Sequence, residues 1–293
     1  MRKLSDEGLG VKTVCEVFGV SRDAYYKGQK RRSKSYGAEH VVLKVVDSIR
    51  RDEPRVGTRK LHHRLKRIGK KVGRDSLFSL LKETGRLVTP KKSFVKTTYS
   101  RHSYAVAPNL IKGISVTRPK QVVVCDITYL QMVRGQFAYL FLVTDMFSRR
   151  IVGFHVSRDL SHYSALAALD VAVRTLGDVE GIIHHSDRGS QYCCHEYLRY
   201  LQGLKMRPSM TDEAHCYQNA IAERVNGILK DEFNLDRIFY GITEVLREVP
   251  SAIETYNTKR THWSLGLKTP LEFHNQALES TCKEGLEKLS TPC

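Results

Sequence analysis

The sequence predicts an α/β domain with a mixed sheet, preceded by a basic region that is entirely helical. Three observations support this fold class. Apolar residues recur with helical spacing over the first 86 residues, three β-branched segments follow one another from residue 121, and helical and extended patterns alternate beyond residue 160. Consecutive strands followed by alternating strands and helices are typical of a mixed sheet covered by helices.

Positive charge is concentrated at the start of the chain. The 293 residues carry a formal net charge of +17. Residues 1–120 contain 30 Lys and Arg against 10 Asp and Glu, whereas residues 121–293 contain 18 against 21. A solvated surface usually mixes the two signs, so this excess favours a nucleic-acid partner over mere solubility.

The first residues predict two helical segments. Residues 1–30 show the pattern of a helix-turn-helix, with a turn at Gly19 and Ser21 as the N-cap of the second helix; a simple αα-hairpin is the alternative. Residues 37–86 predict a helical, helix-turn-helix-like DNA-binding domain with three helices, the last of which stops at Gly85. Their polar faces are basic, and the DNA contacts expected there are Arg59, Lys60, Arg64 and Arg74.

Residues 87–118 lack a sustained period and are predicted to form a basic linker. Such a segment can track phosphates, although an ordinary solvated connection explains it nearly as well. Residues 119–280 then form the predicted catalytic domain, and 281–293 a C-terminal tail. The strands expected are 121–130, 137–145, 150–156, one at Ile182-Ile183 and one near 204–208.

Helices are expected between and after these strands. One begins at Ser161, a second lies near 194–202, and a third contains Glu223. A later helical pattern over 244–256 is interrupted by Pro250, which should kink or restart it. Thr269-Pro270 reads as the N-cap and first residue of a last helix.

Three acidic residues are the candidates for chemistry. Asp126 lies in a β-branched run, where an unpaired buried carboxylate would be very costly, so a cation partner is expected. Asp187 follows a short apolar strand, at a tip that presents side chains. Glu223 lies on a helix, and Asn219 and Lys230 share its face.

The blocks around these acids resemble a known family. Asp126-Ile127-Thr128-Tyr129, His185 to Tyr192, and Asn219-Ala220 with Glu223 and Lys230 are similar to the three blocks of the DDE transposases of bacterial insertion sequences. The likeness is to the second-frame catalytic product of the insertion-sequence-three family, which is related to retroviral integrases. Thirty-five residues separate Asp187 from Glu223, as in that triad, and residues 256–265 are similar to the family's end block.

The chain departs from the family pattern at two positions. Val123 stands where the family usually has a Trp, and Gln218 where it usually has an Asp before the Asn-Ala pair. Neither position belongs to the acidic triad, so these differences bear on local packing and DNA contact rather than on the chemistry.

The resemblance implies a ribonuclease H-like catalytic core that cleaves DNA 3′ ends and joins them to another strand. Asp126, Asp187 and Glu223 would be the catalytic residues and would hold two Mg²⁺ ions, for which Mn²⁺ should substitute, because hard cations prefer oxygen ligands. Lys230, Arg188, Gln191 and Asn219 would contact DNA near the triad. His184 and His185 flank the site, but a structural role suits them better.

Two other functions compete with transposition: a ribonuclease H-like nuclease that only hydrolyses, and a non-enzymatic DNA-binding regulator. The basic front argues against the first, and three retained acids against the second. The expected partners are double-stranded DNA at element ends and target, further copies of the chain on DNA, and an upstream-frame helix-turn-helix protein or fusion.

The expected location is the cytoplasm, in association with the nucleoid and away from membranes. No apolar run approaches the length of about 18 residues that suggests a membrane-spanning helix. Seven cysteines without regular spacing argue against a disulfide framework. Cys193-Cys194-His195 is the one cluster, and a zinc site there is the less favoured interpretation because neighbouring side chains on a helix diverge.

Overall fold

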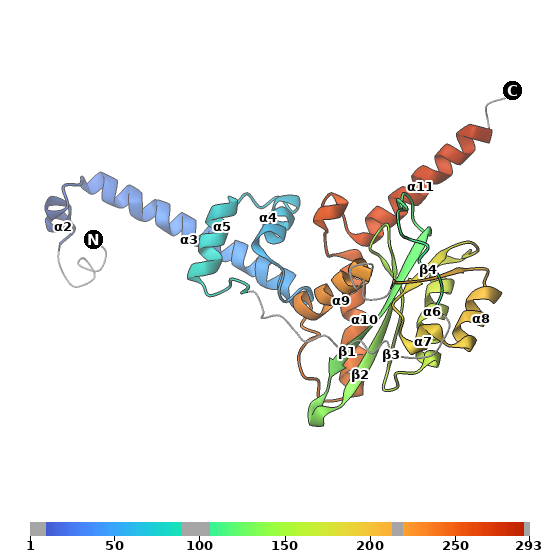
Figure 1. Cartoon of the computed structure of the whole chain (residues 1–293). Helices are drawn as coiled ribbons and strands as arrows, with labels where there is room; N and C mark the ends of the chain where they lie inside the picture. The colour runs from blue at the N-terminus through green and yellow to red at the C-terminus, as the bar shows by residue number, and fades with distance from the viewer. Residues whose placement is uncertain (1–9, 90–105, 213–218, 290–293) are drawn as a thin grey trace. The chain divides into compact units, whose positions relative to one another are not determined.

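The computed structural model describes residues 10–89, 106–212 and 219–289, and for residues 29, 31–36 and 281–289 it describes the backbone alone. The chain divides into two compact units. The helical unit comprises residues 1–51 and 56–88, and the sheet unit comprises 52–55 and 89–293 (Figure 1).

In the described part of the helical unit, the last three of four helices pack around a small apolar core. The helices are α2 (Val11–Val17), α3 (Arg22–Asp52), α4 (Thr58–Arg67) and α5 (Arg74–Glu83). Leu61 and Leu65 of α4 and Leu77 and Leu81 of α5 are fully buried together with Val46 of α3. Leucines four residues apart lie on one helix face, and this spacing places the basic residues of α4 and α5 on the remaining faces.

Helix α3 is longer than the sequence predicted. We expected a break between the segment 1–30 and the domain 37–86, but one helix of 31 residues runs through this boundary. The intervening stretch contains no proline and no clear capping pair, so nothing in it stops a helix once α3 has started. The expected turn at Gly19 is present, with φ of +63°. Residues 1–9 of the predicted helix-turn-helix lie outside the described residues.

The sheet unit is built on a five-stranded mixed sheet with the order β3-β2-β1-β4-β5. The strands are β1 (Val122–Gln131), β2 (Phe137–Asp145), β3 (Ile151–Ser157), β4 (Ile183–Ser186) and β5 (Arg207–Met210). The first three form an antiparallel meander, whereas β4 joins β1 and β5 joins β4 in parallel. The predicted mixed α/β architecture is therefore correct, and its topology is that of a ribonuclease H-like core.

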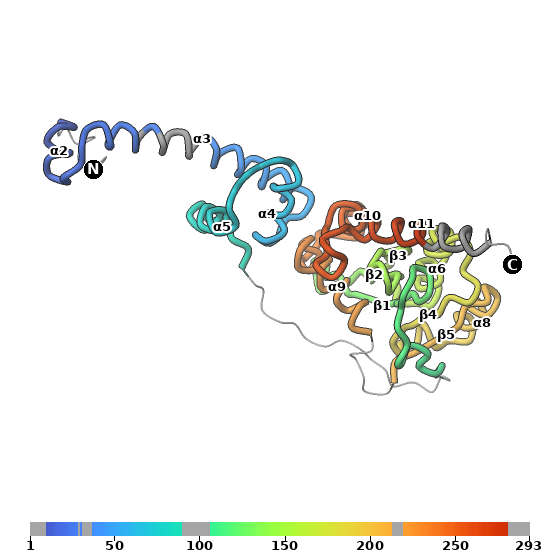
Figure 2. The backbone as a smooth tube through the Cα atoms, turned by 90° about the horizontal axis from the view of Figure 1, so that it is seen from above, coloured from blue at the N-terminus to red at the C-terminus, as the bar shows by residue number. Residues whose placement is uncertain are grey.

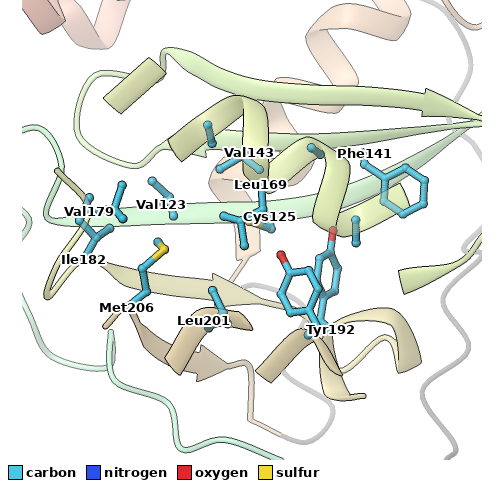
Figure 3. Packing of buried hydrophobic residues seen from close by; sticks show 14 of the residues in the cluster. Val123, Cys125, Phe141, Val143, Leu169, Val179, Ile182, Tyr192, Leu201 and Met206 are labelled. Carbon is cyan, nitrogen blue, oxygen red and sulfur yellow. The ribbon is translucent and has the colours of Figure 1, made fainter. Parts of the chain in front are cut away.

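Helices cover both faces of this sheet (Figures 1 and 2). Helices α6 (His162–Leu176), α7 (Ser190–Cys193) and α8 (His195–Gly203) pack on one face. Helices α9 (Ala220–Glu232) and α10 (Ile242–Thr258) pack on the other. Figure 3 shows the first of these cores, where Cys125 and Val143 of the strands face Leu169 of α6 and Leu201 of α8.

Two C-terminal features differ in their agreement with the sequence. Pro250 lies inside α10, which continues past it as one helix instead of restarting. Helix α11 (Pro270–Leu289) begins where expected, and Thr269 and Glu272 cap it reciprocally, each backbone N–H bonding to the other's side chain. The predicted tail from residue 281 is therefore helical as far as Leu289.

The second half of the predicted linker belongs to the sheet unit. Leu110, Ile111 and Val116 pack against buried residues of β1 and β4. The backbone N–H of Leu110 also donates to Ser209 Oγ on β5, at 2.9 Å. These apolar side chains have a core to join, so residues 106–118 are not a solvated connection; residues 90–105 lie outside the described residues.

Two further findings concern the chemistry of the whole chain. Among the described ranges, no helix has both the length and the apolar content needed to cross a membrane. Cys15, Cys125, Cys193 and Cys194 are free thiols, all of them buried.

Candidate active site

The structure brings Asp126 and Asp187 to neighbouring positions on adjacent parallel strands. The pairing of β1 with β4 sets Val124 opposite His185. Asp126 lies two residues beyond Val124, and Asp187 lies two residues beyond His185, just past the end of β4. Because side chains two apart share a face of a sheet, the two carboxylates project from the same side.

Glu223 reaches the same place from α9. Two amides on this helix bind β1 directly: Asn219 Nδ2 donates to the backbone oxygen of Cys125 at 3.1 Å, and Asn226 Nδ2 donates to Asp126 Oδ2 at 2.7 Å. Glu223 lies between these two residues, in the first turn of α9, and is exposed. The helix that carries the third acid is thus fixed to the strand that carries the first.

The pKa of Asp126 reflects how close the three acids are. Burial among protein atoms, then the charge of Asp187 and, more weakly, that of Glu223 raise the pKa of Asp126 to about 7, although the bond from Asn226 opposes the rise. Part of the Asp126 surface remains open to solvent. Three carboxylates that repel one another around an accessible oxygen form an electrostatic site for a cation.

A tight turn orients the carboxylate of Asp187. The backbone N–H of Gly189 donates to Asp187 Oδ1 at 2.9 Å. A Cβ at position 189 would lie 3.0 Å from that same oxygen and from Gln191 Oε1, so glycine lets the turn close on the carboxylate. One carboxylate oxygen is therefore held by the backbone, as in an Asx turn.

Lys230 lies two turns along α9 from Glu223 and close to Asp126. It is half-buried; burial lowers the pKa of its ammonium group, and the nearby charges of Asp126 and then Asp236 act in the opposite direction. A lysine held in this way beside the acids is placed to meet a phosphate oxygen at the same site.

The other predicted contacts near the triad differ in accessibility. Arg188 and Gln191 are half-buried and donate to the backbone oxygens of Thr211 and Leu160, respectively. Asn219 is only 4% exposed and caps the strand–helix contact described above. The contact of Asn219 with DNA stays a prediction, and the low exposure of its side chain weighs against it.

The paired histidines are parts of the core. His184 Nε2 lies 3.0 Å from Cys125 Sγ and 2.9 Å from Tyr197 Oη, and His185 Nδ1 lies 2.9 Å from Ser209 Oγ. Burial lowers the pKa of each histidine to about 4, so both are neutral near pH 7. They support β4 beneath Asp187 and carry no charge to the site.

The predicted DNA contacts of the helical unit lie on α4 and at the start of α5. Arg59 and Arg74 are exposed, whereas Lys60 and Arg64 are half-buried. Arg74 also pairs with Asp75 through a 2.9 Å contact between Nε and Oδ1. These four residues belong to the helical unit, whereas the acids belong to the sheet unit.

Sequence reasoning missed Asn226. It lies three residues after Glu223, so helical spacing alone could have placed it on the face that carries the acid. Its hydrogen bond to Asp126 depends on how α9 crosses β1, and that crossing is visible only in the structure.

The donor set fits a hard divalent cation. All three candidates are carboxylates, and Glu223 is exposed. A bound cation would favour the ionised form of Asp126 and so lower its raised pKa.

The residue in the Trp position of the family pattern, Val123, is fully buried and packs in the core below β1. Gln218 lies outside the described residues.

Comparisons with known proteins agree with this arrangement. Two family models described as "Integrase core domain" match residues 116–216 and 204–270. The chain is 34% identical over 267 residues to the "Insertion element IS600 uncharacterized 31 kDa protein" of Shigella sonnei, covering 90% of this chain and 98% of that protein. It is 29% identical over 281 residues to "Transposase InsF for insertion sequence IS3A" of Escherichia coli (strain K12), covering 92% and 96%.

Among solved structures, two distant likenesses involve retroviral proteins. The HTLV-2 integrase catalytic core domain in complex with magnesium has a TM-score of 0.43 and 16% identity, over 54% of this chain and 97% of that one. A chain of the simian T-cell lymphotropic virus intasome in complex with PP2A regulatory subunit B56 gamma has a TM-score of 0.45 and 18% identity, over 75% and 70%.

Proposed function

Because the chain belongs to the insertion-sequence-three (IS3) family of DDE transposases, we propose that Asp126, Asp187 and Glu223 are its catalytic carboxylates and its metal ligands. The protein is a polynucleotidyl transferase that acts in transposition and DNA integration. The competing readings, a nuclease that only hydrolyses and a regulator without activity, are set aside by this family membership.

The observation that carries the site assignment is the convergence on Asp126. Burial and then the charges of two other carboxylates raise its pKa, and a hydrogen bond from Asn226 fixes one of its oxygens. Ionising a buried carboxyl beside two other carboxylates costs free energy, and a bound cation offsets that cost. This is expected for a metal ligand rather than for a surface charge.

We propose Mg²⁺ as the cofactor, in two sites, with Mn²⁺ as a substitute. When bound, such ions activate a water or a 3′-hydroxyl and stabilise the departing 3′-oxygen. The residues of the chain would hold these ions and orient the ligand oxygens. Asp126 and Asp187, fixed by Asn226 and Gly189, provide rigid ligands, whereas the exposed Glu223 is free to adjust when DNA arrives.

We further propose that the partner is double-stranded DNA and that copies of the chain assemble on it. Lys230, Arg188 and Gln191 would meet DNA beside the acids, and Arg59, Lys60, Arg64 and Arg74 would bind it through the helical unit. An upstream-frame helix-turn-helix protein, separate or fused, would add affinity for the element ends.

A strand-transfer assay tests this function. The full chain, alone and fused to its upstream frame, is given a duplex with a pre-cut 3′-hydroxyl and a target duplex in Mg²⁺. We expect joined products. Hydrolysis without joining would favour the nuclease reading, and no metal-dependent product would favour the regulator.

The same assay tests the three acids one at a time. Asp126→Asn, Asp187→Asn and Glu223→Gln each keep the shape of the side chain and remove an anionic ligand. Metal stabilisation is worth several kcal/mol, so each variant should lose about a thousandfold or more in both hydrolysis and joining. Glu254→Gln, at an exposed position on α10, is the control. Joining at the wild-type rate by any of the three would remove that residue from the site.

A further inference from the structure

A second group of side chains that could hold a metal ion consists of residues outside the acidic triad. One ligand atom each from His162, Cys194 and Glu196 lies within 4.8 Å of the other two. His162 is the first residue of α6, Cys194 separates α7 from α8, and Glu196 lies in the first turn of α8. Two helices that are distant in the sequence thus begin at one place, and their first side chains converge there.

The ring nitrogen of His162 is an independent sign of a missing partner. Its Nε2 atom is buried and makes no hydrogen bond. A buried polar atom without a partner costs on the order of 1–3 kcal/mol, and a bound cation would remove that cost. The ring itself is held against Tyr163, with centroids 4.0 Å apart.

The cysteine and the glutamate complete the set. Cys194 is a buried free thiol whose Sγ donates to the backbone oxygen of Gln191, at 3.5 Å. Burial, and after it the neighbouring Glu196 carboxylate, raise the pKa of this thiol. The backbone N–H of Glu196 itself, and more weakly the charge of His162, lower the pKa of the Glu196 carboxyl.

We propose that His162, Cys194 and Glu196 bind one Zn²⁺ ion, with water as the fourth ligand. Zinc accepts this mixture of nitrogen, sulfur and oxygen, whereas Mg²⁺ prefers oxygen alone. Ligand atoms of a tetrahedral zinc site are about 3.5 Å apart, so the side chains close by roughly 1 Å on binding. The thiol releases its proton to solvent as the Zn–S bond forms.

The ion would join the start of α6 to the α7–α8 junction. The bond from Gln191 Nε2 to the backbone oxygen of Leu160, at 3.1 Å, already links the same two segments. Cys194 follows Asp187 by seven residues through the turn at Gly189 and the short helix α7. The site is therefore a clamp on the segment that leads from Asp187; its effect on catalysis, unlike the binding itself, rests on the proposed function.

Cobalt binding tests the site without any readout of activity. Co²⁺ replaces Zn²⁺ in tetrahedral sites, and a coordinated thiolate adds an intense ligand-to-metal charge-transfer band to its spectrum. The full chain carries Asp126→Asn, Asp187→Asn and Glu223→Gln, so that the acidic triad contributes little to binding. We expect one Co²⁺ per chain, a thiolate band, and displacement of Co²⁺ by added Zn²⁺.

Single substitutions in that background locate the ligands. Cys194→Ser should abolish the band, and His162→Ala and Glu196→Gln should weaken binding at least about tenfold. Cys193→Ser is the matched control, because Cys193 is buried against Met210 Sδ instead and should leave the band unchanged. Circular dichroism checks that each variant folds. If Cys194→Ser does not fold, the loss of Co²⁺ affinity in Glu196→Gln, a substitution at an exposed position, tests the site instead.

Three outcomes would overturn the proposal: no thiolate band at saturating Co²⁺, a band that survives Cys194→Ser, or a band that Cys193→Ser removes. A negative result in the cobalt experiment would not contradict the proposed function, which the strand-transfer assay tests separately. Conversely, a chain that binds Co²⁺ through Cys194 but joins no DNA would contradict the proposed function alone.

Discussion

At the scale of single residues, the acidic site depends on an amide. Asn226 Nδ2 donates to Asp126 Oδ2, and this bond favours the ionised carboxylate against burial and the charge of Asp187. An amide suits this position because it can donate to the carboxylate without neutralising it. A basic side chain there would compete with a metal ion for the same oxygen.

The raised pKa of Asp126 predicts a pH-dependent stability of the metal-free protein. A carboxyl whose folded pKa is about 7, against 3.8 ordinarily, favours folding fully below about pH 4 and loses that contribution as the pH rises through 7. Between pH 5 and 8 the loss should be on the order of 2 to 3 kcal/mol.

Urea unfolding of the wild type and of Asp126→Asn, in a chelator, measures this loss. The difference between the two free energies of unfolding isolates Asp126 from other titrating groups. We expect the wild type to weaken relative to the variant as the pH rises, and Mg²⁺ to restore part of the difference. A difference that stays constant from pH 5 to 8 would show that the carboxyl is ionised throughout.

A separate prediction concerns Lys230. Lys230→Ala should weaken placement of the DNA end and slow joining, while Mg²⁺ binding to the acids stays at least as strong, because a competing positive charge near Asp126 has been removed. Lys205→Ala is the control, since Lys205 is exposed in the connection between α8 and β5, where it pairs with Glu180. Wild-type joining by the Lys230 variant would make Lys230 a packing residue.

At the scale of elements, close approach of α6 to the sheet depends on Gly153 in β3. A Cβ there would lie 2.4 Å from the backbone oxygen of Ala168 and 2.6 Å from the backbone nitrogen of Ala172. Backbone atoms cannot move aside as a flexible side chain can, so Gly153→Ala should destabilise the sheet unit by about 1–3 kcal/mol or more.

Calorimetric unfolding of the full chain checks this packing. Gly203→Ala, at the end of α8, is the comparison because no atom lies within 4 Å of its added methyl group. The first substitution should lower the unfolding temperature of the sheet unit, and the second should leave it unchanged or raise it slightly. Equal effects would indicate that α6 can shift away from β3.

Much of the sheet unit could be predicted because its signals are local. Strands β1, β2 and β3 start and end within one residue of their predicted bounds, since β-branched runs and turn residues mark both ends. Asp126, Asp187 and Glu223 were singled out by their strand and helix contexts and by spacing, and they remain a proposal that the geometry supports.

What was missed depended on contacts between elements. Strand β5 begins at Arg207 instead of near residue 204, because the end of α8 and the positive φ of Lys205 occupy the predicted start. Asn226 and the group of His162, Cys194 and Glu196 were also missed. The sequence suggested Cys193 and His195 as the neighbours of Cys194 in a metal site. The residue that lies close to Cys194 is instead His162 of α6, 32 residues earlier.

At the scale of the whole molecule, charge and chemistry belong to different parts of the chain. The acids lie in the sheet unit, whereas the whole excess of Lys and Arg over Asp and Glu precedes residue 121. This separation keeps the positive charge that would bind DNA apart from the three carboxylates. Strong positive charge beside these acids would compete with metal ions for them.

The last prediction tests that separation with two fragments. Residues 1–88 should bind duplex DNA with an affinity that falls steeply as salt is added, whereas residues 89–293, which keep the segment that packs against β1 and β4, should bind weakly. Counterion release gives a log–log slope of about −0.9 for each neutralised phosphate, so several contacts by the basic fragment should give a slope of several units. Within it, Arg59→Ala should reduce the slope by about one unit, since Arg59 is exposed on α4, whereas Glu83→Gln, an exposed acid on α5, should not reduce it. Binding of equal strength and equal salt dependence by the two fragments would show that the net charge of the front does not determine where DNA is held.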